Sequence, residues 1–355
     1  MVENRSTDLA MRHLVVDLAA RAKTWSLTEQ GADRIRDAVG ADWKVSIVGA
    51  PTVSDGDGNA RPSDEAIRAI RDAEVYVGFG ISRPLFLEAR ALRWVHSAAA
   101  GVGSALFPEM VESEVLFTNS AGVHAVPIAE YVAGGILFLL RGFDVARDRQ
   151  RERRWDKSPF VEGHVPVREM SECRALIVGA GGLGSAIATR LASLGARCTG
   201  VRRRPALGAP PGFDRVIGPE PQALDAEIPH ADILIIAAPQ TRTTRGLIGR
   251  ERIARLPAGA IVVNVARGAL LDEEALAEAI EGGVLRGAVL DVFAEEPLPA
   301  ESCLWTLPSV LITPHVAAVS PNGFWRRELE LLLDNWRRYV NGEPLRNLVD
   351  KRAGY

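Results

Sequence analysis

Short apolar runs alternate with helix-like stretches along most of the chain. In the first third, the runs that are typical of strands cover residues 13–18, 43–49, 74–80, 93–99 and 114–120. Between two of these runs, Ser63 stands before apolar residues at helical spacing, and serine is a residue type that caps helix N-termini. Strands that alternate with helices predict a parallel sheet with helices on both faces.

A second series of the same kind begins at Ala175. Its apolar runs cover residues 175–179, 197–201, 231–239, 260–266, 287–293 and 309–315. One intervening helix is marked by Asp272 as its cap, acidic residues in its first turn and Gly282 just after its end. The two series predict two domains of related architecture.

Three further segments complete the pattern. Residues 127–152 predict one long helix, with Pro127 in the first turn, where a missing N–H costs nothing. Residues 151–173 are charged and lack apolar periodicity, so we expect them to wrap the surface or a partner subunit. A last helix is predicted from Ser320 to Gly342, and through it the chain can return to the first domain.

Length, composition and charge narrow the class of protein. The chain has 355 residues, of which 47% are apolar and 25% charged, as in globular proteins of one or two domains. A net charge of −3 provides no general basic field, so we expect no nucleic-acid partner. The spacing of Cys173, Cys198 and Cys303 suits neither a zinc site nor a disulfide framework, which predicts buried free thiols and no metal.

The chain also lacks the patterns of membrane insertion and export. No apolar run approaches the roughly 20 residues that a membrane-spanning helix needs. Near the N-terminus, Arg12, His13 and Asp17 interrupt the apolar residues, which argues against a secretory signal peptide. We therefore expect a cytoplasmic protein with no membrane partner.

A glycine pattern follows the first apolar run of the second series. Gly179, Gly181 and Gly184 form G-x-G-x-x-G, with Gly182 and Leu183 between the last two glycines. Such glycines allow a tight turn, a close approach of the backbone to a pyrophosphate, and close packing of helix on strand. The alternative is a glycine-rich turn without a ligand, but the position between strand and helix favours a dinucleotide site.

Three arginines follow the next apolar run, which ends at Val201. They are Arg202, Arg203 and Arg204. A site specific for NAD would place Asp or Glu here to bind the ribose hydroxyls, whereas guanidinium groups match the geometry of a 2′-phosphate. We therefore predict that NADP(H) is preferred over NAD(H), with Arg202 and Arg203 nearest the phosphate. The alternative is a solvated basic turn.

Four polar residues lie at or shortly after predicted strand ends: Arg267, Asp291, Glu296 and His315. Ligands of open α/β sheets bind beyond the carboxyl ends of the strands, so these side chains are expected to converge. Taken singly, Arg267 could be a surface residue and His315 a structural histidine. Glu295 competes with Glu296 for the role of the acidic residue.

Together these segments resemble the D-isomer-specific 2-hydroxyacid dehydrogenase family over nearly the whole chain. The segments that carry the resemblance are 179–184, 238–249, 264–276, 290–299 and 313–317. The resemblance implies two Rossmann-like, doubly wound parallel-sheet domains. It implies that a cofactor domain of residues 124–317 is inserted into a discontinuous, flavodoxin-like substrate domain of residues 1–123 and 318–355, with the active site between them.

The resemblance assigns catalysis to Arg267, Glu296 and His315. It implies reduction of a 2-keto acid to a D-2-hydroxy acid by hydride from NADPH, as in glyoxylate/hydroxypyruvate reductases. Arg267 would bind the substrate carboxylate and carbonyl as a planar, permanently charged donor. His315 would give a proton to the developing alkoxide, and Glu296 would favour its imidazolium form.

The resemblance also assigns binding residues. Those expected near the cofactor are Ala238, Pro239 and Thr244 at the ribose, Val265 and Ala266 near the nicotinamide, and Asp291 at the nicotinamide end. The backbone N–H groups of Ala100 and Gly101 would hold the substrate carboxylate. Gly103 departs from the family pattern, since relatives often carry Asp or Asn there. His124 receives no role, and the histidines expected to be non-catalytic are His13, His96, His164 and His230.

Two alternatives remain open from the sequence. One is a nucleotide-sensing interaction protein, like the corepressor relatives of the family. The other is a dehydrogenase of another small anion on the same scaffold. Relatives commonly dimerise through the cofactor domain, and the aromatic, proline-bearing segment 155–167 is a candidate arm for a homodimer.

Overall fold

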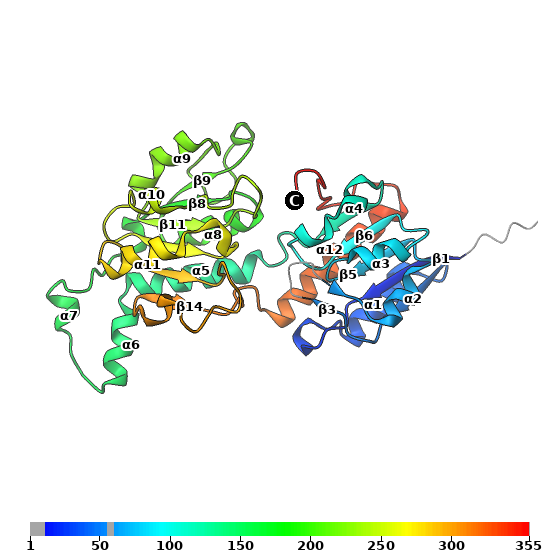
Figure 1. Cartoon of the computed structure of the whole chain (residues 1–355), viewed down its shortest axis with the longest axis horizontal. Helices are drawn as coiled ribbons and strands as arrows, with labels where there is room; N and C mark the ends of the chain where they lie inside the picture. The colour runs from blue at the N-terminus through cyan, green and yellow to red at the C-terminus, as the bar shows by residue number, and fades with distance from the viewer. Residues whose placement is uncertain (1–10, 55–59, 355) are drawn as a thin grey trace, which may run out of the picture. The chain divides into compact units, whose positions relative to one another are not determined.

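The computed structural model describes residues 11–54 and 60–354, which form two units (Figure 1). The first unit contains the described residues up to Val123 and those from Ser320 onward, and the second unit runs from His124 to Val319. The sequence placed the return to the first domain at residue 318. The first ten residues, part of the segment in which we expect no signal peptide, lie outside the described residues.

The sheet of the first unit is parallel throughout. In spatial order its strands are β2 (Trp43–Ile47), β1 (Arg12–Asp17), β5 (Val75–Gly78), β6 (Trp94–Ser97) and β7 (Leu116–Asn119). The larger helices are α1 (Glu29–Val39), α2 (Asp64–Ile70), α3 (Arg83–Glu88), α4 (Pro108–Glu112) and α12 (Pro321–Val340). This strand order, 2-1-3-4-5, is that of flavodoxin. A short antiparallel pair, β3 (Val53–Ser54) with β4 (Ala60–Arg61), was not predicted.

Alternation along the strands builds two core layers in the first unit. On β1, Leu14 and Val16 face the layer that α12 covers, whereas Val15 faces the opposite layer. Helix α2 begins as predicted, because the Ser63 hydroxyl accepts a hydrogen bond from the backbone N–H of Ala66. The described residues at both ends of the chain therefore share one domain.

The second unit, which is described throughout, contains a seven-stranded parallel sheet. In spatial order its strands are β10 (Arg215–Ile217), β9 (Arg197–Val201), β8 (Arg174–Val178), β11 (Ile233–Ile236), β12 (Ile261–Asn264), β13 (Gly287–Leu290) and β14 (Val310–Ile312). The helices are α5 (Ala125–Leu140), α6 (Phe143–Arg151), α7 (Ser158–Val161), α8 (Gly182–Ser193), α9 (Pro221–Glu227), α10 (Arg250–Ile253) and α11 (Glu273–Glu281). The order is the 3-2-1-4-5-6 of dinucleotide-binding folds with one strand added, so the predicted fold class is confirmed.

The single long helix predicted over residues 127–152 is wrong. Helix α5 ends at Leu140, and α6 starts at Phe143 after a bend of 69°. Gly142 adopts a left-handed conformation with φ of 67°, which glycine accepts at little cost and which ends the helix. Among the described residues, no single helix is long and apolar enough to cross a membrane. The α5–α6 pair meets that test only when both helices are counted together.

Candidate active site

Three of the predicted site residues follow three adjacent strands of the second unit. Arg267 follows β12, Asp291 follows β13 directly, and His315 follows β14. Strands β12, β13 and β14 are parallel neighbours, so their carboxyl ends lie at one edge of the sheet. The ends of these strands therefore lie side by side, and among the side chains expected to converge, those of His315 and Glu296 are in direct contact.

The loop that carries His315 is folded around the buried carboxylate of Asp291. One oxygen of Asp291 accepts hydrogen bonds from the Thr313 hydroxyl at 2.5 Å and the Val316 backbone N–H at 2.8 Å. The other oxygen accepts from the Ala317 N–H at 2.9 Å, and the His315 N–H donates to the Asp291 carbonyl at 2.9 Å. These bonds hold His315 in a left-handed conformation, φ 54°, which a non-glycine residue rarely adopts.

His315 and Glu296 form a directly hydrogen-bonded pair. Their Nδ1 and Oε2 atoms are 2.9 Å apart, and the other carboxylate oxygen of Glu296 accepts from the Phe293 N–H at 2.9 Å. Because an ionised carboxylate only accepts, Nδ1 is the donor, and Nε2 remains to exchange a proton with a ligand. Both side chains are more than a third exposed. Between the two acids that competed in the sequence, the structure pairs Glu296, not Glu295, with His315.

The turn that carries Arg267 packs directly against the turn that carries Glu296. A Cβ on Gly268 would lie 1.8 Å from the Phe293 carbonyl carbon, so only glycine allows the two backbones to approach this closely. The fully buried Asn264 side chain fixes the start of the turn. Its amide donates to the Arg267 carbonyl at 3.1 Å, and its oxygen accepts from the Ala266 N–H at 3.1 Å.

A third acid, Glu273, supports the same turn from the first position of α11. Its carboxylate accepts a hydrogen bond from the Ala294 N–H at 2.7 Å. Burial raises the pKa of Glu273, and the nearby charge of Glu296 adds to the rise, while the Ala294 hydrogen bond opposes it. From the sequence, this acid was read only as a favourable charge in the first turn of a helix.

Helix α5 contributes a tyrosine to the same region. The Tyr131 hydroxyl lies 2.8 Å from the Thr313 hydroxyl, which in turn donates to Asp291. Burial raises the pKa of Tyr131 to about 12, with the charge of Asp291 adding to the rise and the Thr313 hydrogen bond opposing it. The sequence did not predict four of these residues, because each acts through a contact that local sequence patterns do not reveal: Tyr131, Asn264, Gly268 and Glu273.

The glycine turn after β8 has the form of a phosphate cradle. Gly179 has φ of 114°, and a Cβ there would lie 2.7 Å from the backbone of Ala237 and Ala238. A Cβ on Gly184 would lie 2.1 Å from the Gly179 carbonyl oxygen, whereas one on Gly181 would meet no described atom within 4 Å. Helix α8 begins at Gly182, so its first N–H groups face this open space. The residues present therefore fit a dinucleotide.

The other predicted cofactor residues line the same strand ends. Arg202 directly follows β9, and one of its guanidinium nitrogens donates to the Gly208 carbonyl at 2.9 Å. Arg203 is exposed. After β11, the Thr244 hydroxyl donates to the Pro239 carbonyl at 2.7 Å and shapes the loop between them. The small apolar residues of this set are almost fully buried: Ala238, Val265 and Ala266.

In the first unit, the predicted substrate loop follows β6. The Ala99 carbonyl accepts from the Ser120 N–H at 3.2 Å, and the Ala100 carbonyl accepts from the Asn119 side-chain amide at 2.8 Å. In a trans peptide the N–H points opposite to the carbonyl, so the N–H groups of Ala100 and Gly101 point away from these partners. Neither N–H has an acceptor among the described residues. Two adjacent, unpaired N–H groups form an anion-binding arrangement.

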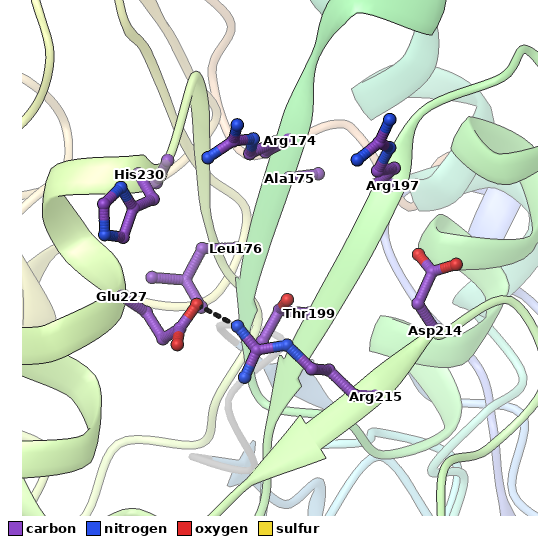
Figure 2. Close-up of a pocket in the computed structure, with 10 residues that line it drawn as sticks. Arg174, Ala175, Leu176, Arg197, Thr199, Asp214, Arg215, Glu227 and His230 are labelled. Carbon is purple, nitrogen blue, oxygen red and sulfur yellow. Dashed lines mark hydrogen bonds and ion pairs between the residues drawn. The ribbon is translucent and has the colours of Figure 1, made fainter.

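A separate cavity of about 320 Å³ lies at the opposite end of the second unit's strands. Arg174 opens β8 and Arg197 opens β9, and Figure 2 shows both among the residues that line it, with Arg215 bonded to Glu227. His230, which we expect to be non-catalytic, also lines it. The cavity is therefore distinct from the strand ends that carry the candidate active site.

The three cysteines differ in burial. In the described part of the chain all three cysteines are free, but Cys303 is exposed at the start of a short 3-10 helix, Cys303–Thr306, which corrects the expectation of a buried thiol. Burial raises the pKa of the Cys198 thiol to about 12. No group of three or more His, Cys, Asp or Glu side chains in the described ranges is arranged to hold a metal ion.

Comparison with known proteins establishes the family. The model described as "D-isomer specific 2-hydroxyacid dehydrogenase, NAD binding domain" matches residues 133–317. The glyoxylate/hydroxypyruvate reductase A of Salmonella typhi is 34% identical over 277 residues, which cover 76% of this chain and 84% of that protein. The chain therefore belongs to the D-isomer-specific 2-hydroxyacid dehydrogenase family, as its motifs predicted.

Solved structures show the same architecture. A D-isomer specific 2-hydroxyacid dehydrogenase from Xanthobacter autotrophicus, in complex with NADPH and MES, has a TM-score of 0.76 and 29% identity, and the match covers 98% of this chain and 100% of that chain. The NADPH-dependent glyoxylate/hydroxypyruvate reductase of Sinorhizobium meliloti, in complex with NADP and sulfate, has a TM-score of 0.74 and 26% identity. That match covers 97% of this chain and 100% of the other.

Proposed function

We propose that the protein reduces small 2-keto acids to D-2-hydroxy acids with NADPH. The observation that carries the proposal is the His315–Glu296 pair, held at the strand ends by the hydrogen bonds of Asp291. A histidine whose Nδ1 is bound by a carboxylate and whose Nε2 is available is arranged for general acid–base catalysis. Membership of the dehydrogenase family supports the reaction class.

The proposed reaction divides the work between cofactor and protein. When bound, the reduced nicotinamide supplies a hydride to the keto carbon. His315 gives its Nε2 proton to the oxygen that becomes the hydroxyl, and Glu296 stabilises the charged imidazole before that transfer. Arg267 pairs with the substrate carboxylate and polarises the adjacent keto carbonyl, because a planar guanidinium presents several N–H donors at once. In the reverse direction, neutral His315 accepts the proton.

The substrate carboxylate is proposed to bind the N–H groups of Ala100 and Gly101. Their peptide planes are fixed by Asn119 and Ser120, and both N–H groups lack an acceptor among the described residues. Backbone N–H groups that are already oriented bind an anion without a further ordering cost. This arrangement fits the carboxylate that all 2-keto acids share, from glyoxylate and hydroxypyruvate to bulkier aryl or alkyl keto acids.

NADP(H) is proposed as the preferred cofactor. Arg202 and Arg203 follow the strand at the position where an NAD-specific site carries an acid, and guanidinium groups favour a 2′-phosphate. Two similar structures contain NADPH or NADP, which supports this preference. Gly179, Gly181 and Gly184 would hold the pyrophosphate against the start of α8.

A homodimer formed through the second unit is part of the proposal. Helices α6 and α7 project from the body of that unit in Figure 1. The segment they carry exposes large apolar side chains: Phe143 at 54%, Trp155 at 103% and Val161 at 68%. A fully exposed tryptophan beside other exposed apolar groups is typical of a surface that a partner covers.

The test of the function is the loss of NADPH absorbance with a panel of 2-keto acids. We expect turnover with glyoxylate, hydroxypyruvate or a bulkier member of the panel, and slower turnover with NADH. NADPH binding without turnover of any keto acid would instead favour the nucleotide-sensing alternative. Turnover of another small anion alone would favour the second alternative.

A further inference from the structure

A fully buried network of polar side chains connects β6, β7 and α12 in the first unit. Nε2 of His96 lies 2.9 Å from one carboxylate oxygen of Glu328, and its Nδ1 lies 2.8 Å from the Thr118 hydroxyl. The Ser120 hydroxyl lies 2.6 Å from the other oxygen of Glu328. None of these four residues has any exposed surface. The network has no part in the catalytic chemistry proposed above.

Glu328 is a charged residue type at a fully buried position of α12, where an apolar side chain would be expected. The buried face of α12 is otherwise dominated by large apolar side chains, among them Phe324, Leu329 and Leu332. Removing a carboxylate from water is costly even when it is paired, and apolar residues of similar volume often serve packing equally well. Packing alone therefore does not explain the carboxylate, and we look for the role of the network in the segment that it orients.

That segment is the predicted substrate loop. The Ser120 hydroxyl lies 2.9 Å from the Ser97 carbonyl, where the loop leaves β6, and the Ser120 N–H holds the Ala99 carbonyl. The side-chain amide of the adjacent Asn119 donates to the Ala100 carbonyl. The Asn119 backbone N–H donates to the Asn347 carbonyl, and the Asn119 carbonyl accepts from the Asn347 side-chain amide. The partners that orient the loop carbonyls are thus tied to α12 and to the segment that follows it.

We propose that Glu328 is a positioning residue for substrate binding, acting through Ser120 on the loop from Ala99 to Gly101. By fixing the carbonyls on one side of the loop, it directs the N–H groups of Ala100 and Gly101 to the other side, where the substrate carboxylate binds. The proposal rests on the proposed function of that loop. Because both are fully buried, Glu328 and Ser120 do not touch the substrate themselves.

The experiment compares three variants of the full-length protein. Ser120→Ala deletes the hydroxyl and keeps the backbone N–H, and Glu328→Leu fills the space without an acceptor. Glu328→Gln keeps an acceptor for His96 and can donate to Ser120. We expect Ser120→Ala and Glu328→Leu to raise the KM for glyoxylate about five- to tenfold, with kcat changed less, because the carboxylate contact is the same in ground and transition states. Glu328→Gln is expected to restore a KM within about twofold of wild type.

The matched control is Ile70→Val, which removes one methyl group from a fully buried residue in the opposite core layer of the same unit. Melting temperatures place all variants on one stability scale, and calorimetry measures the binding of NADPH and then of oxalate to the NADPH complex. We expect oxalate affinity to fall in Ser120→Ala and Glu328→Leu while NADPH affinity holds. A KM and oxalate affinity equal to those of Ile70→Val, or a Glu328→Gln variant as impaired as Glu328→Leu, would overturn the proposal.

The two proposals fail differently. A wild-type protein that turns over no keto acid defeats the proposed function, whatever the variants do. Oxalate binding then still reports on the loop as an anion site. Turnover by wild type with unaltered KM in Ser120→Ala and Glu328→Leu defeats the positioning role alone.

Discussion

Asp291 and Thr313 share a 2.5 Å hydrogen bond between carboxylate and hydroxyl, and Asp291 also accepts the N–H groups of Val316 and Ala317. The residue that the family resemblance places at the nicotinamide thus also builds the turn around His315. We expect Asp291→Asn to lower kcat/KM by about 100-fold, because an amide cannot accept all three bonds and a displacement of about 1 Å in a catalytic group has that effect. An unfolding free energy lowered by about 1–3 kcal/mol should accompany the loss. Wild-type kcat/KM in a folded variant would contradict this.

Replacing the catalytic histidine should separate chemistry from cofactor binding. His315→Asn keeps a residue type that tolerates the left-handed backbone, so the loop is preserved. We expect kcat to fall by about 100- to 10,000-fold, the range for loss of a general acid–base group, while the Kd for NADPH holds. Steady-state kinetics and fluorescence titration measure the two quantities. Equal losses in both would show that His315 has a structural role.

Cofactor preference should depend on the first two arginines of the basic turn. For Arg202→Ala combined with Arg203→Ala, we expect the KM for NADPH to rise at least about tenfold, since charge-assisted hydrogen bonds contribute about 1.5–3 kcal/mol each. The KM for NADH should change little. Arg204→Ala is the matched control, and an effect there as large as in the double variant would relocate the phosphate contact.

Glu273 predicts a pH-dependent contribution to stability. Burial raises its folded-state pKa, so the carboxyl group stabilises the fold below its ordinary, unfolded pKa, and this contribution is lost as pH rises through the folded value. At neutral pH, burial of the charged carboxylate therefore lowers the free energy of unfolding. Glu273→Gln keeps an acceptor for the Ala294 N–H and should be more stable than wild type at neutral pH, by less than about 1 kcal/mol because water screens the site. Denaturation at neutral pH and near pH 4 measures this, and an advantage that grows on acidification would contradict the assignment.

The proposed dimer should depend on its exposed tryptophan. Trp155→Ser removes the largest exposed apolar side chain of the segment between α6 and α7 without disturbing a buried contact. We expect the wild-type protein to be a dimer and the variant to dissociate at micromolar concentration, as size-exclusion chromatography with light scattering would measure. Leu207→Ser, another exposed apolar residue of the second unit, is the control. A wild-type monomer would contradict the proposal.

The strand ends of the second unit were predictable because a parallel sheet gathers them at one edge. Arg267, Asp291 and His315 could therefore be grouped from their positions after apolar runs. The break at Gly142 was missed, because an isolated glycine within a helical pattern is compatible with either one helix or two.

The supporting residues could not be found from the sequence for a different reason. Glu273 contacts the turn of Glu296 from another element, and Gly268 matters only because the Phe293 backbone lies against it. His96 was expected to be non-catalytic, and its contact with Glu328 could not be foreseen because Glu328 lies 232 residues further along the chain. Such pairings are set by topology, which local patterns do not encode.

The discontinuity of the first unit also has a consequence for biosynthesis. One face of its sheet is covered by α12, whose Phe324, Trp325 and Trp336 pack with residues of β1 and β6. Helix α1 packs in the same layer, but during translation the part of this face that α12 covers stays exposed until α12 itself has been made. The inserted unit, being continuous, can complete its folding earlier, and a nascent chain halted before α12 would present an aggregation-prone apolar surface to chaperones.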